Sequence, residues 1–206
     1  RNMKKYLISI GGGSTSNVLD IENNFDEIIA VDSGIDHLFE LSLNPSTLIG
    51  DLDSISKSSL DKVKEKGIKI VSFNTKKDQT DFELAIDYLQ EPDKSQIFII
   101  GGESGEIDHL ISIFLLIPSK SFYEQITWLY GDKKIIFREK LNLNIKKSTK
   151  FSLIPLSDLS NLSIDGAEWN LENKNIKFGQ SLTLRNVAVK DEIYIHSDKG
   201  IFAFIY

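Results

Sequence analysis

The sequence changes its pattern once, near residue 131, and this change limits which architectures the chain can adopt. Before it, short runs of Ile, Val and Phe alternate with helical stretches. The runs are apolar at nearly every position, which is typical of strands covered on both faces of a parallel sheet. The alternation therefore predicts an α/β layered domain. Strands are expected at Tyr6–Ile10, Ile28–Val31, Ile68–Phe73, Ile97–Ile100 and Ile126–Tyr130, and helices at Ser54–Lys66, Thr80–Leu89 and Asp108–Ile117.

Each expected helix has a recognisable end or face. The first stops before Gly67, a residue type that is common just after a helix. The second has one apolar stripe, made by Phe82, Ala85, Ile86 and Leu89. The third is apolar nearly all round, so we expect it to be buried and to end at Pro118.

After residue 131 no helical period appears, and short alternating segments are separated by turn signals such as Asp165-Gly166 and Asp198-Lys199-Gly200. Roughly 75 residues of this pattern predict a small β-sandwich, docked on the first half or on a second subunit. Two domains are expected, 1–131 and 132–206. The expected strands are Phe151–Pro155, Leu162–Ile164, Ile176–Phe178, Leu182–Val189, Glu192–His196 and Ile201–Ile205.

Composition excludes several classes of protein. The 206 residues contain no cysteine, which rules out disulfides, zinc–thiolate sites and a thiol nucleophile. A net charge of −6 disfavours nucleic acid as a partner. The longest apolar run, Ile111–Ile117, is too short to span a bilayer, and Lys4 and Lys5 lead straight into a strand rather than a signal peptide. We expect a soluble cytoplasmic protein with no membrane partner.

The first acidic cluster is Asp51 and Asp53, which follow Leu48-Ile49-Gly50. In an extended chain, residues two apart point to the same side, so the two carboxylates would repel unless a cation lay between them. Mg²⁺ fits, because it takes one or two protein carboxylates and completes its octahedron with water and phosphate oxygens. The structural alternative is a solvated turn in which Asp53 or Ser54 caps the next helix.

The second cluster runs from Lys76 to Glu83. Thr80 and Glu83 fit a capping box, which explains them without a function. The capping box leaves Asp81 unexplained at the first helical position, together with Lys77 and Asp78 before it. A helix N-terminus beside a lysine is also a natural phosphate site, so both interpretations stay open.

Glycine-rich turns follow two of the expected strands. Gly11-Gly12-Gly13 and the stretch from Gly101 to His109 allow backbone N–H groups to approach a nucleotide. Asp32-Ser33-Gly34 follows a third strand. Asp108 has a helix N-cap as its structural alternative, and His109 a structural role. Together these strand ends predict a crevice for a polyphosphate and a metal ion.

One aromatic residue in the second half lies in polar surroundings, Trp169 within Glu168-Trp169-Asn170. Such a tryptophan is usually partly buried. If exposed, it could stack on a flat heteroaromatic or cationic ligand.

The order of these motifs resembles the thiamine pyrophosphokinase family. The resemblance rests on DSG (32–34), GDLDS (50–54), KKDQTDFELA (76–85), G-x-x-G-x-x-DH (102–109) and a C-terminal β region with a tryptophan. It implies a Rossmann-like parallel sheet with flanking helices, followed by a smaller all-β sandwich. It also implies a homodimer that binds thiamine at the subunit interface. The implied reaction transfers a pyrophosphoryl group from ATP to the thiamine hydroxyl, releases AMP and needs Mg²⁺.

The resemblance also implies roles for individual residues. It implies a catalytic and metal-binding role for Asp51, Asp53 and Asp81, a nucleotide-side role for Asp32, Ser33, Lys77, Asp78, Gly102, Gly105, Asp108 and His109, and a thiamine-side role for Gln79, Thr80, Trp169 and Asn186. Glu106 and Arg185 depart from the family pattern, which has Arg and Ser at those positions. Asp81 is our candidate for the group that accepts the hydroxyl proton. The alternatives are another Mg²⁺-dependent nucleotide phosphohydrolase, or a thiamine-binding relative without activity.

Overall fold

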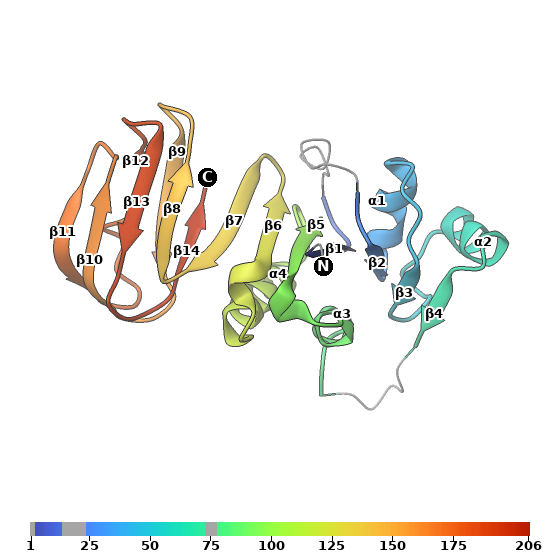
Figure 1. The fold of residues 1–206 in the computed structure, drawn as a ribbon. Helices are drawn as coiled ribbons and strands as arrows, with labels where there is room; N and C mark the ends of the chain where they lie inside the picture. The colour runs from blue at the N-terminus through green and yellow to red at the C-terminus, as the bar shows by residue number, and fades with distance from the viewer. Residues whose placement is uncertain (1–2, 14–23, 73–77) are drawn as a thin grey trace. The chain divides into compact units, whose positions relative to one another are not determined.

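The computed structural model describes residues 3–13, 24–72 and 78–206 (Figure 1). The chain divides into two compact units, Arg1–Asp132 and Lys133–Tyr206, and each is described by itself below. No helix of the described residues is long and apolar enough to cross a membrane.

The first unit is built on a parallel sheet in the order β6-β5-β1-β2-β3-β4 (Figure 1). The strands are β1 (Lys4–Ser9), β2 (Glu27–Val31), β3 (Thr47–Ile49), β4 (Lys69–Val71), β5 (Ser95–Ile100) and β6 (Ile126–Tyr130). Most of their apolar side chains are buried on both faces, as the continuous apolar runs predicted, but Ile70 of the edge strand β4 is 40% exposed. Strand β3 was not expected, because a strand of three residues is too short to show a period.

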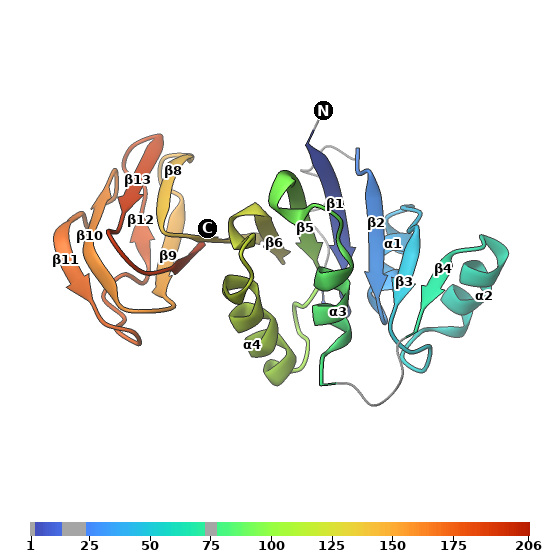
Figure 2. The same ribbon diagram turned by 60° about the horizontal axis from the view of Figure 1, so that its bottom comes forward.

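In the described part of the chain, this sheet is flanked by the helices α1 (Gly34–Glu40), α2 (Lys57–Glu65), α3 (Asp81–Tyr88) and α4 (Ile107–Leu116). Helices α3 and α4 lie on the same face of the sheet in both Figure 1 and Figure 2. The described residues of this unit also form 3₁₀ turns at Pro92–Lys94, Ile117–Ser119 and Tyr123–Gln125. Helix α1 was not expected, because its start coincides with the Asp32-Ser33-Gly34 turn signal.

The helix starts follow local capping chemistry. Thr80 caps α3 as predicted, since its hydroxyl oxygen accepts a hydrogen bond from the Glu83 N–H at 3.2 Å. The cap of α2 is Ser56, whose side chain accepts from the Ser59 N–H at 3.2 Å. The alternative that Asp53 or Ser54 caps this helix is therefore wrong.

Helix α4 differs from its prediction in two ways. Its N-cap is Glu106, so Asp108 lies inside the first turn and does not cap the helix. The helix is also not buried, because Ile107, Ile111 and Leu115 are 68%, 52% and 55% exposed on one side. The apolar composition correctly predicts an apolar face toward the core. It does not show whether another element packs against the opposite face.

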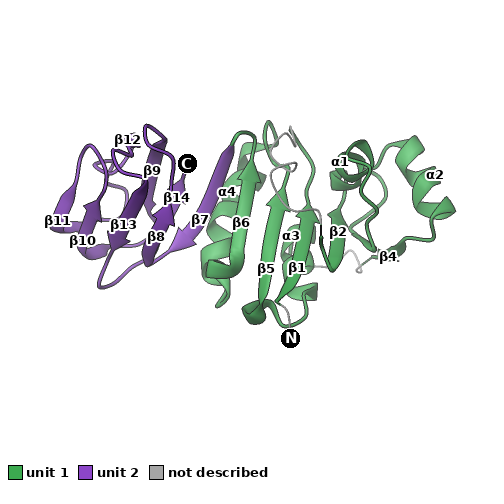
Figure 3. Ribbon diagram, turned by 45° about the horizontal axis from the view of Figure 1, so that its top comes forward, with its two compact units in different colours: residues 1–132 green, residues 133–206 purple. Residues whose placement is uncertain are grey.

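The second unit is a sandwich of two antiparallel sheets, drawn in purple in Figure 3. One sheet has the order β12-β9-β14-β7, with strands Asn186–Val187, Lys150–Pro155, Phe202–Ile205 and Lys133–Arg138. The other has the order β11-β10-β13-β8, with strands Leu171–Ile176, Leu159–Asp165, Glu192–His196 and Lys140–Asn144. Side chains from both sheets, such as Phe204 and Ile164, share one buried core. The predicted fold class, a Rossmann-like sheet followed by a smaller β-sandwich, is confirmed.

Two expected strands of the second unit are wrong in place or length. The segment around Ile176–Phe178 is instead the end of β11 and the turn after it. Of Leu182–Val189, only Asn186–Val187 is strand, because Arg185 has a left-handed backbone (φ 55°) that interrupts an extended chain. Strands β7 and β8 were not expected.

Candidate functional site

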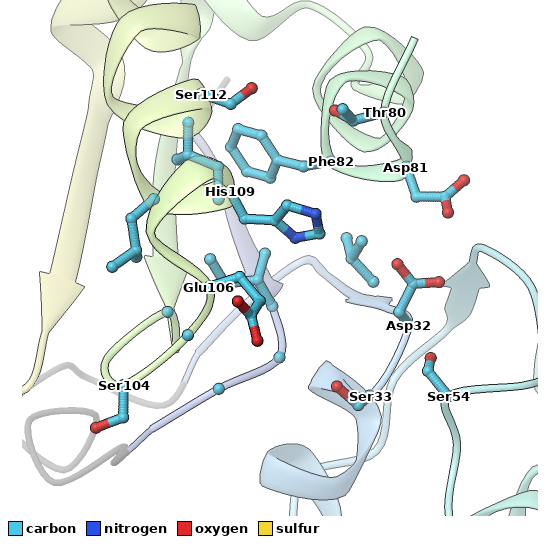
Figure 4. Close-up of a pocket in the computed structure, with 18 residues that line it drawn as sticks. Asp32, Ser33, Ser54, Thr80, Asp81, Phe82, Ser104, Glu106, His109 and Ser112 are labelled. Carbon is cyan, nitrogen blue, oxygen red and sulfur yellow. The ribbon is translucent and has the colours of Figure 1, made fainter.

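A pocket of about 580 Å³ opens where β1, β2 and β5 end and where α3 and α4 begin (Figure 4). From β1 the chain builds the sheet outward through β2, β3 and β4 on one side and through β5 and β6 on the other. The strand order therefore reverses beside β1, and ligands of open α/β sheets bind at the carboxyl ends of the strands at such a point. The lining residues are Ile10, Gly11, Gly12, Val31, Asp32, Ser33, Ser54, Thr80, Asp81, Phe82, Gly102, Ser104, Gly105, Glu106, His109, Leu110, Ser112 and Ile113.

Two glycine turns are bonded to each other at the edge of this pocket. The Gly102 N–H donates to the carbonyl oxygens of Gly11 and Gly12, at 2.9 and 3.1 Å. His37 of α1 donates from Nε2 to the Gly12 oxygen at 3.0 Å, because a carbonyl can only accept. The two turns are thus held together by backbone contacts, which leaves no room for larger side chains between them.

Asp32 occupies an unusual position at the end of β2. Its backbone is left-handed (φ 47°), which costs free energy for a residue other than glycine. A Cβ atom added at Gly50 (φ 127°) would lie 1.9 Å from Asp32 Oδ1. The Asp32 carboxyl therefore lies against the Gly50 backbone, at a place that only glycine leaves open.

The Asp32 carboxyl also has a strongly perturbed acidity. Its pKa is raised from 3.8 to about 7, first by burial and then by the negative charges of Asp81 and Asp51. The Asp51 backbone N–H lowers this pKa, and a side-chain hydrogen bond with Asp81 raises it further. Three carboxyl groups from three different loops thus act on one another at this end of the sheet.

These residues fit a divalent cation. Asp32 Oδ1 is buried and has no hydrogen-bond partner among the residues that the structure describes, so it is an acceptor without a donor. Within the same described part of the chain, no three acidic or histidine side chains are close enough to hold a metal by themselves. Mg²⁺ does not need such a cluster, because it usually binds through one or two carboxylates plus water and phosphate oxygens.

Seven of the residues singled out in the sequence line the pocket: Asp32, Ser33, Thr80, Asp81, Gly102, Gly105 and His109. Figure 4 shows Asp32 and Asp81 as neighbours at one side of the pocket, with the His109 ring pointing toward them from α4. Glu106 also lines the pocket, and its side chain makes no capping bond to α4. The described lining residues therefore carry three carboxylates and no lysine or arginine.

Six of the singled-out residues are not among those that line the pocket. Asp51 and Asp53 are exposed in one turn, where the Asp53 N–H donates to Asp51 Oδ1 at 3.3 Å. The chain is not extended there. The expectation that both carboxylates point to the same side of an extended chain is therefore wrong. Gln79 donates to Asp87 at 3.0 Å, and Asp108 accepts from the His109 N–H at 2.9 Å. Asp78 is exposed, and Lys77 lies outside the described residues.

The two remaining residues belong to the second unit and contact each other. Trp169 is 58% exposed, whereas Asn186 is 4% exposed. The Asn186 side chain bonds to both backbone groups of Trp169, at 3.1 and 2.9 Å.

Several lining residues were not singled out in the sequence. Ser112 and Ile113 follow His109 at the spacing of one helical turn, and this spacing could have identified them once His109 was chosen. Ser54 and Phe82 lie inside the quoted motifs GDLDS and KKDQTDFELA but were given no role in the site. Ser104 carries no pattern that would have identified it. The same holds for His37, which does not line the pocket but bonds to the Gly12 oxygen at its edge.

Comparisons with known proteins identify the family of the chain. Residues 19–127 match the family model "Thiamin pyrophosphokinase, catalytic domain", and residues 138–202 match "Thiamin pyrophosphokinase, vitamin B1 binding domain". A thiamine pyrophosphokinase of Bacillus subtilis is 29% identical over 98% of both chains. The crystal structure of a thiamine pyrophosphokinase from Bacillus subtilis superposes with a TM-score of 0.85 at 22% identity, over 98% of each chain. A family protein from Enterococcus faecalis gives 0.84 at 25% identity, also over 98% of each chain.

Proposed function

Because the chain belongs to the thiamin pyrophosphokinase family, we propose that its pocket binds ATP and that a pyrophosphoryl group passes from ATP to thiamine. Formation of thiamine diphosphate from thiamine is the activity that the family shares, and the chain is an enzyme of that kind. The observation that carries the proposal is the acidic pocket where the strand order of the sheet reverses.

The nucleotide is proposed to lie along the two glycine turns. The backbone at Gly12, Gly102 and Gly105 lines the pocket without side chains, so phosphate oxygens can approach it closely. His109 is the one lining residue among those described that can carry a positive charge, and we assign it to the phosphates. Asp32, Ser33, Lys77, Asp78 and Asp108 are proposed as supporting positions on the nucleotide side.

The three carboxylates that line the pocket, Asp32, Asp81 and Glu106, require a counter-charge before a triphosphate can enter. Asp51, Asp53 and Asp81 are the residues that we propose to hold Mg²⁺, and Asp32 adds negative charge beside them. When bound, Mg²⁺ would neutralise phosphate charge. Without it, the carboxylates would repel ATP.

The reaction needs positioning and one proton acceptor. The thiamine hydroxyl oxygen attacks the β-phosphorus of ATP, the bond from that phosphorus to the oxygen that bridges it to the α-phosphorus breaks, and AMP leaves with that oxygen. Asp81 is proposed to take the hydroxyl proton, because it lines the pocket at the start of α3. The chain has no cysteine, and we expect no covalent enzyme intermediate.

Thiamine is proposed to bind between two subunits of a homodimer. Trp169 is exposed and can stack on the flat, cationic thiamine rings. Gln79 and Thr80 stand next to Asp81 in sequence and are proposed to lie near the reacting hydroxyl. A cytoplasmic location stays a prediction from the sequence.

The experiment that tests this function is AMP release from Mg-ATP, measured with and without thiamine. AMP formation that requires both thiamine and Mg²⁺ is the expected result. Thiamine-independent consumption of ATP would instead indicate a phosphohydrolase, and thiamine binding without AMP release would indicate a relative that has lost its activity. Asp51→Asn and Asp53→Asn are expected to abolish turnover while the circular dichroism spectrum stays native, and near-normal AMP release in either would contradict the metal assignment.

A further inference from the structure

Asn186 is a buried polar side chain that forms two of its hydrogen bonds with the backbone of one residue, Trp169. Its Oδ1 accepts from the Trp169 N–H at 3.1 Å, and its Nδ2 donates to the Trp169 carbonyl oxygen at 2.9 Å. The same Oδ1 accepts from the Val187 N–H at 2.9 Å. One side chain thus satisfies both backbone polar groups of Trp169, as a neighbouring strand would.

The segment before Trp169 is held equally well. The Glu168 N–H donates to the Val187 oxygen at 2.8 Å, and Ala167 and Ala188 form an antiparallel bridge. The Ala167 N–H also donates to the Asn170 side chain at 3.0 Å. The backbone around Trp169 is therefore fixed on both sides of the turn.

The indole that this backbone carries is, in contrast, 58% exposed. An exposed ring contributes little to the stability of the fold, so the fold alone does not require its backbone to be fixed by a buried side chain. A fixed aromatic surface does benefit a ligand, because less conformational entropy is lost when the ligand binds. The hydrogen bonds of Asn186 are made to backbone, and its burial keeps it from solvent.

We propose that Asn186 is a positioning residue, which supports thiamine binding by holding the Trp169 backbone and does not itself contact thiamine. This inference rests on the proposed function, in which Trp169 stacks on thiamine. It refines the thiamine-side role that the sequence suggested for Asn186. The expected consequence is that Asn186 affects thiamine affinity only while Trp169 is present.

The test is a double-mutant cycle with Asn186→Ala, Trp169→Ala and the double variant, with the Kd for thiamine measured by calorimetry. Asn186→Ala is expected to raise this Kd about tenfold, and to add less than about twofold in the Trp169→Ala background. The KM for ATP is expected to stay within about twofold in all three variants. A full tenfold effect of Asn186→Ala in the absence of Trp169 would overturn the inference, because Asn186 would then bind thiamine directly.

Two further variants keep the test decisive. Asn170→Ala is the matched control: it removes an asparagine bond to backbone in the same turn but none to Trp169, and is expected to leave the thiamine Kd within about twofold. A tenfold effect there would mean that any loosening of the turn suffices, which contradicts a specific role for Asn186. If Asn186→Ala does not fold, Asn186→Asp keeps the acceptor but replaces the donor to the Trp169 oxygen with a carboxylate oxygen, which adds a negative charge and cannot donate. It is expected to raise the Kd several-fold, and an unchanged Kd would overturn the inference.

Failure of the proposed function gives a different pattern. If Trp169→Ala leaves the thiamine Kd unchanged, Trp169 does not stack on thiamine and the inference fails together with that role. If Trp169→Ala raises the Kd but Asn186→Ala does not, only the positioning role fails. Quenching by thiamine adds a readout apart from activity, because the other tryptophan, Trp128, is 2% exposed and the response comes from Trp169.

Discussion

The pocket of the first unit and the Trp169 turn of the second unit differ in whether their polar groups have hydrogen-bond partners. At the pocket, Asp32 has a buried oxygen with no hydrogen-bond partner among the described residues, a left-handed backbone and a raised pKa. At the turn, the backbone groups of Trp169 are paired, and only the ring is left exposed. Among the described residues, the pocket has carboxylates without a lysine or arginine beside them, and the turn has an aromatic ring that is exposed to solvent.

This difference indicates what each region is expected to bind. Uncompensated carboxylates favour a cation and the phosphates that come with it, whereas a fixed exposed ring favours a flat ligand. The two regions should also respond differently to substitution. Removing a pocket carboxylate should lower activity without weakening the fold, and replacing the ring should change only the affinity for thiamine.

After the metal-site variants described above, the largest effect is expected from Asp81→Asn. The substitution removes a pocket carboxylate and the proposed proton acceptor, so kcat for thiamine-dependent AMP release should fall by about 10²–10⁴-fold. Thermal unfolding should occur at or above the wild-type temperature, because a repulsion with Asp32 is relieved. Asp61→Asn, at an exposed site on α2, is the control and should keep wild-type kcat. A kcat within tenfold of wild type for Asp81→Asn would contradict the assignment.

The next effect is on the fold. Gly50→Ala would place a Cβ 1.9 Å from Asp32 Oδ1 at a φ of 127°, which only glycine adopts readily. We expect the free energy of unfolding to fall by about 2–4 kcal/mol, measured by urea titration. Gly67→Ala is the matched control, since its φ is also positive (63°) but nothing lies within 4 Å of the added Cβ. It should cost only about 1 kcal/mol, and an equal loss in both variants would show that the Asp32 contact is unimportant.

The third effect depends on pH. The native Asp32 carboxyl keeps its proton up to a pKa of about 7, whereas the unfolded one loses it near 3.8. As pH rises between these values, the native state is penalised for its charge, so wild-type stability should decline relative to Asp32→Asn. At pH 8 without divalent ions, the variant should be more stable by about 1–2 kcal/mol, a figure reduced because the carboxyl is partly exposed to solvent.

The difference between the two proteins should nearly vanish at about pH 4, where the native wild-type carboxyl is protonated and the unfolded one is only about half ionised. A thermal melt at each pH measures it. A constant difference across pH 4–8 would mean that Asp32 is not destabilised by its surroundings.

The smallest effect is expected from Trp169→Phe. A smaller ring at the same place should weaken thiamine binding by about two- to fivefold, as expected for part of a stacking or cation–π contact. Stability should stay within about 0.5 kcal/mol, because the side chain is exposed. Tyr194→Phe, at another exposed ring, is the control and should leave the Kd unchanged.

The parts of the fold that could be predicted from the sequence are those set by local chemistry. Apolar runs identified the longer parallel strands, and Thr80 was identified as a cap because capping requires only neighbouring residues. Long-range packing was harder to predict. Whether an apolar face of α4 is buried depends on which other elements pack against it, and the composition of the helix does not show this.

The same division holds for the site. Motif residues such as Asp81 and His109 line the pocket, since the carboxyl ends of parallel strands meet at one edge of a sheet. The turn at Asp51 and the bonds of Asn186 to Trp169 could not be predicted, because both depend on side-chain contacts that no spacing rule gives.

The measurement that tests the central claim most directly is a crystal structure of the protein with Mn²⁺ in place of Mg²⁺ and a non-hydrolysable ATP analogue, with anomalous data collected for the metal. The account predicts an anomalous peak within about 2–2.5 Å of carboxylate oxygens among Asp51, Asp53 and Asp81, with the phosphates along the glycine turns. A bound analogue whose metal peak lies away from all three carboxylates would contradict it.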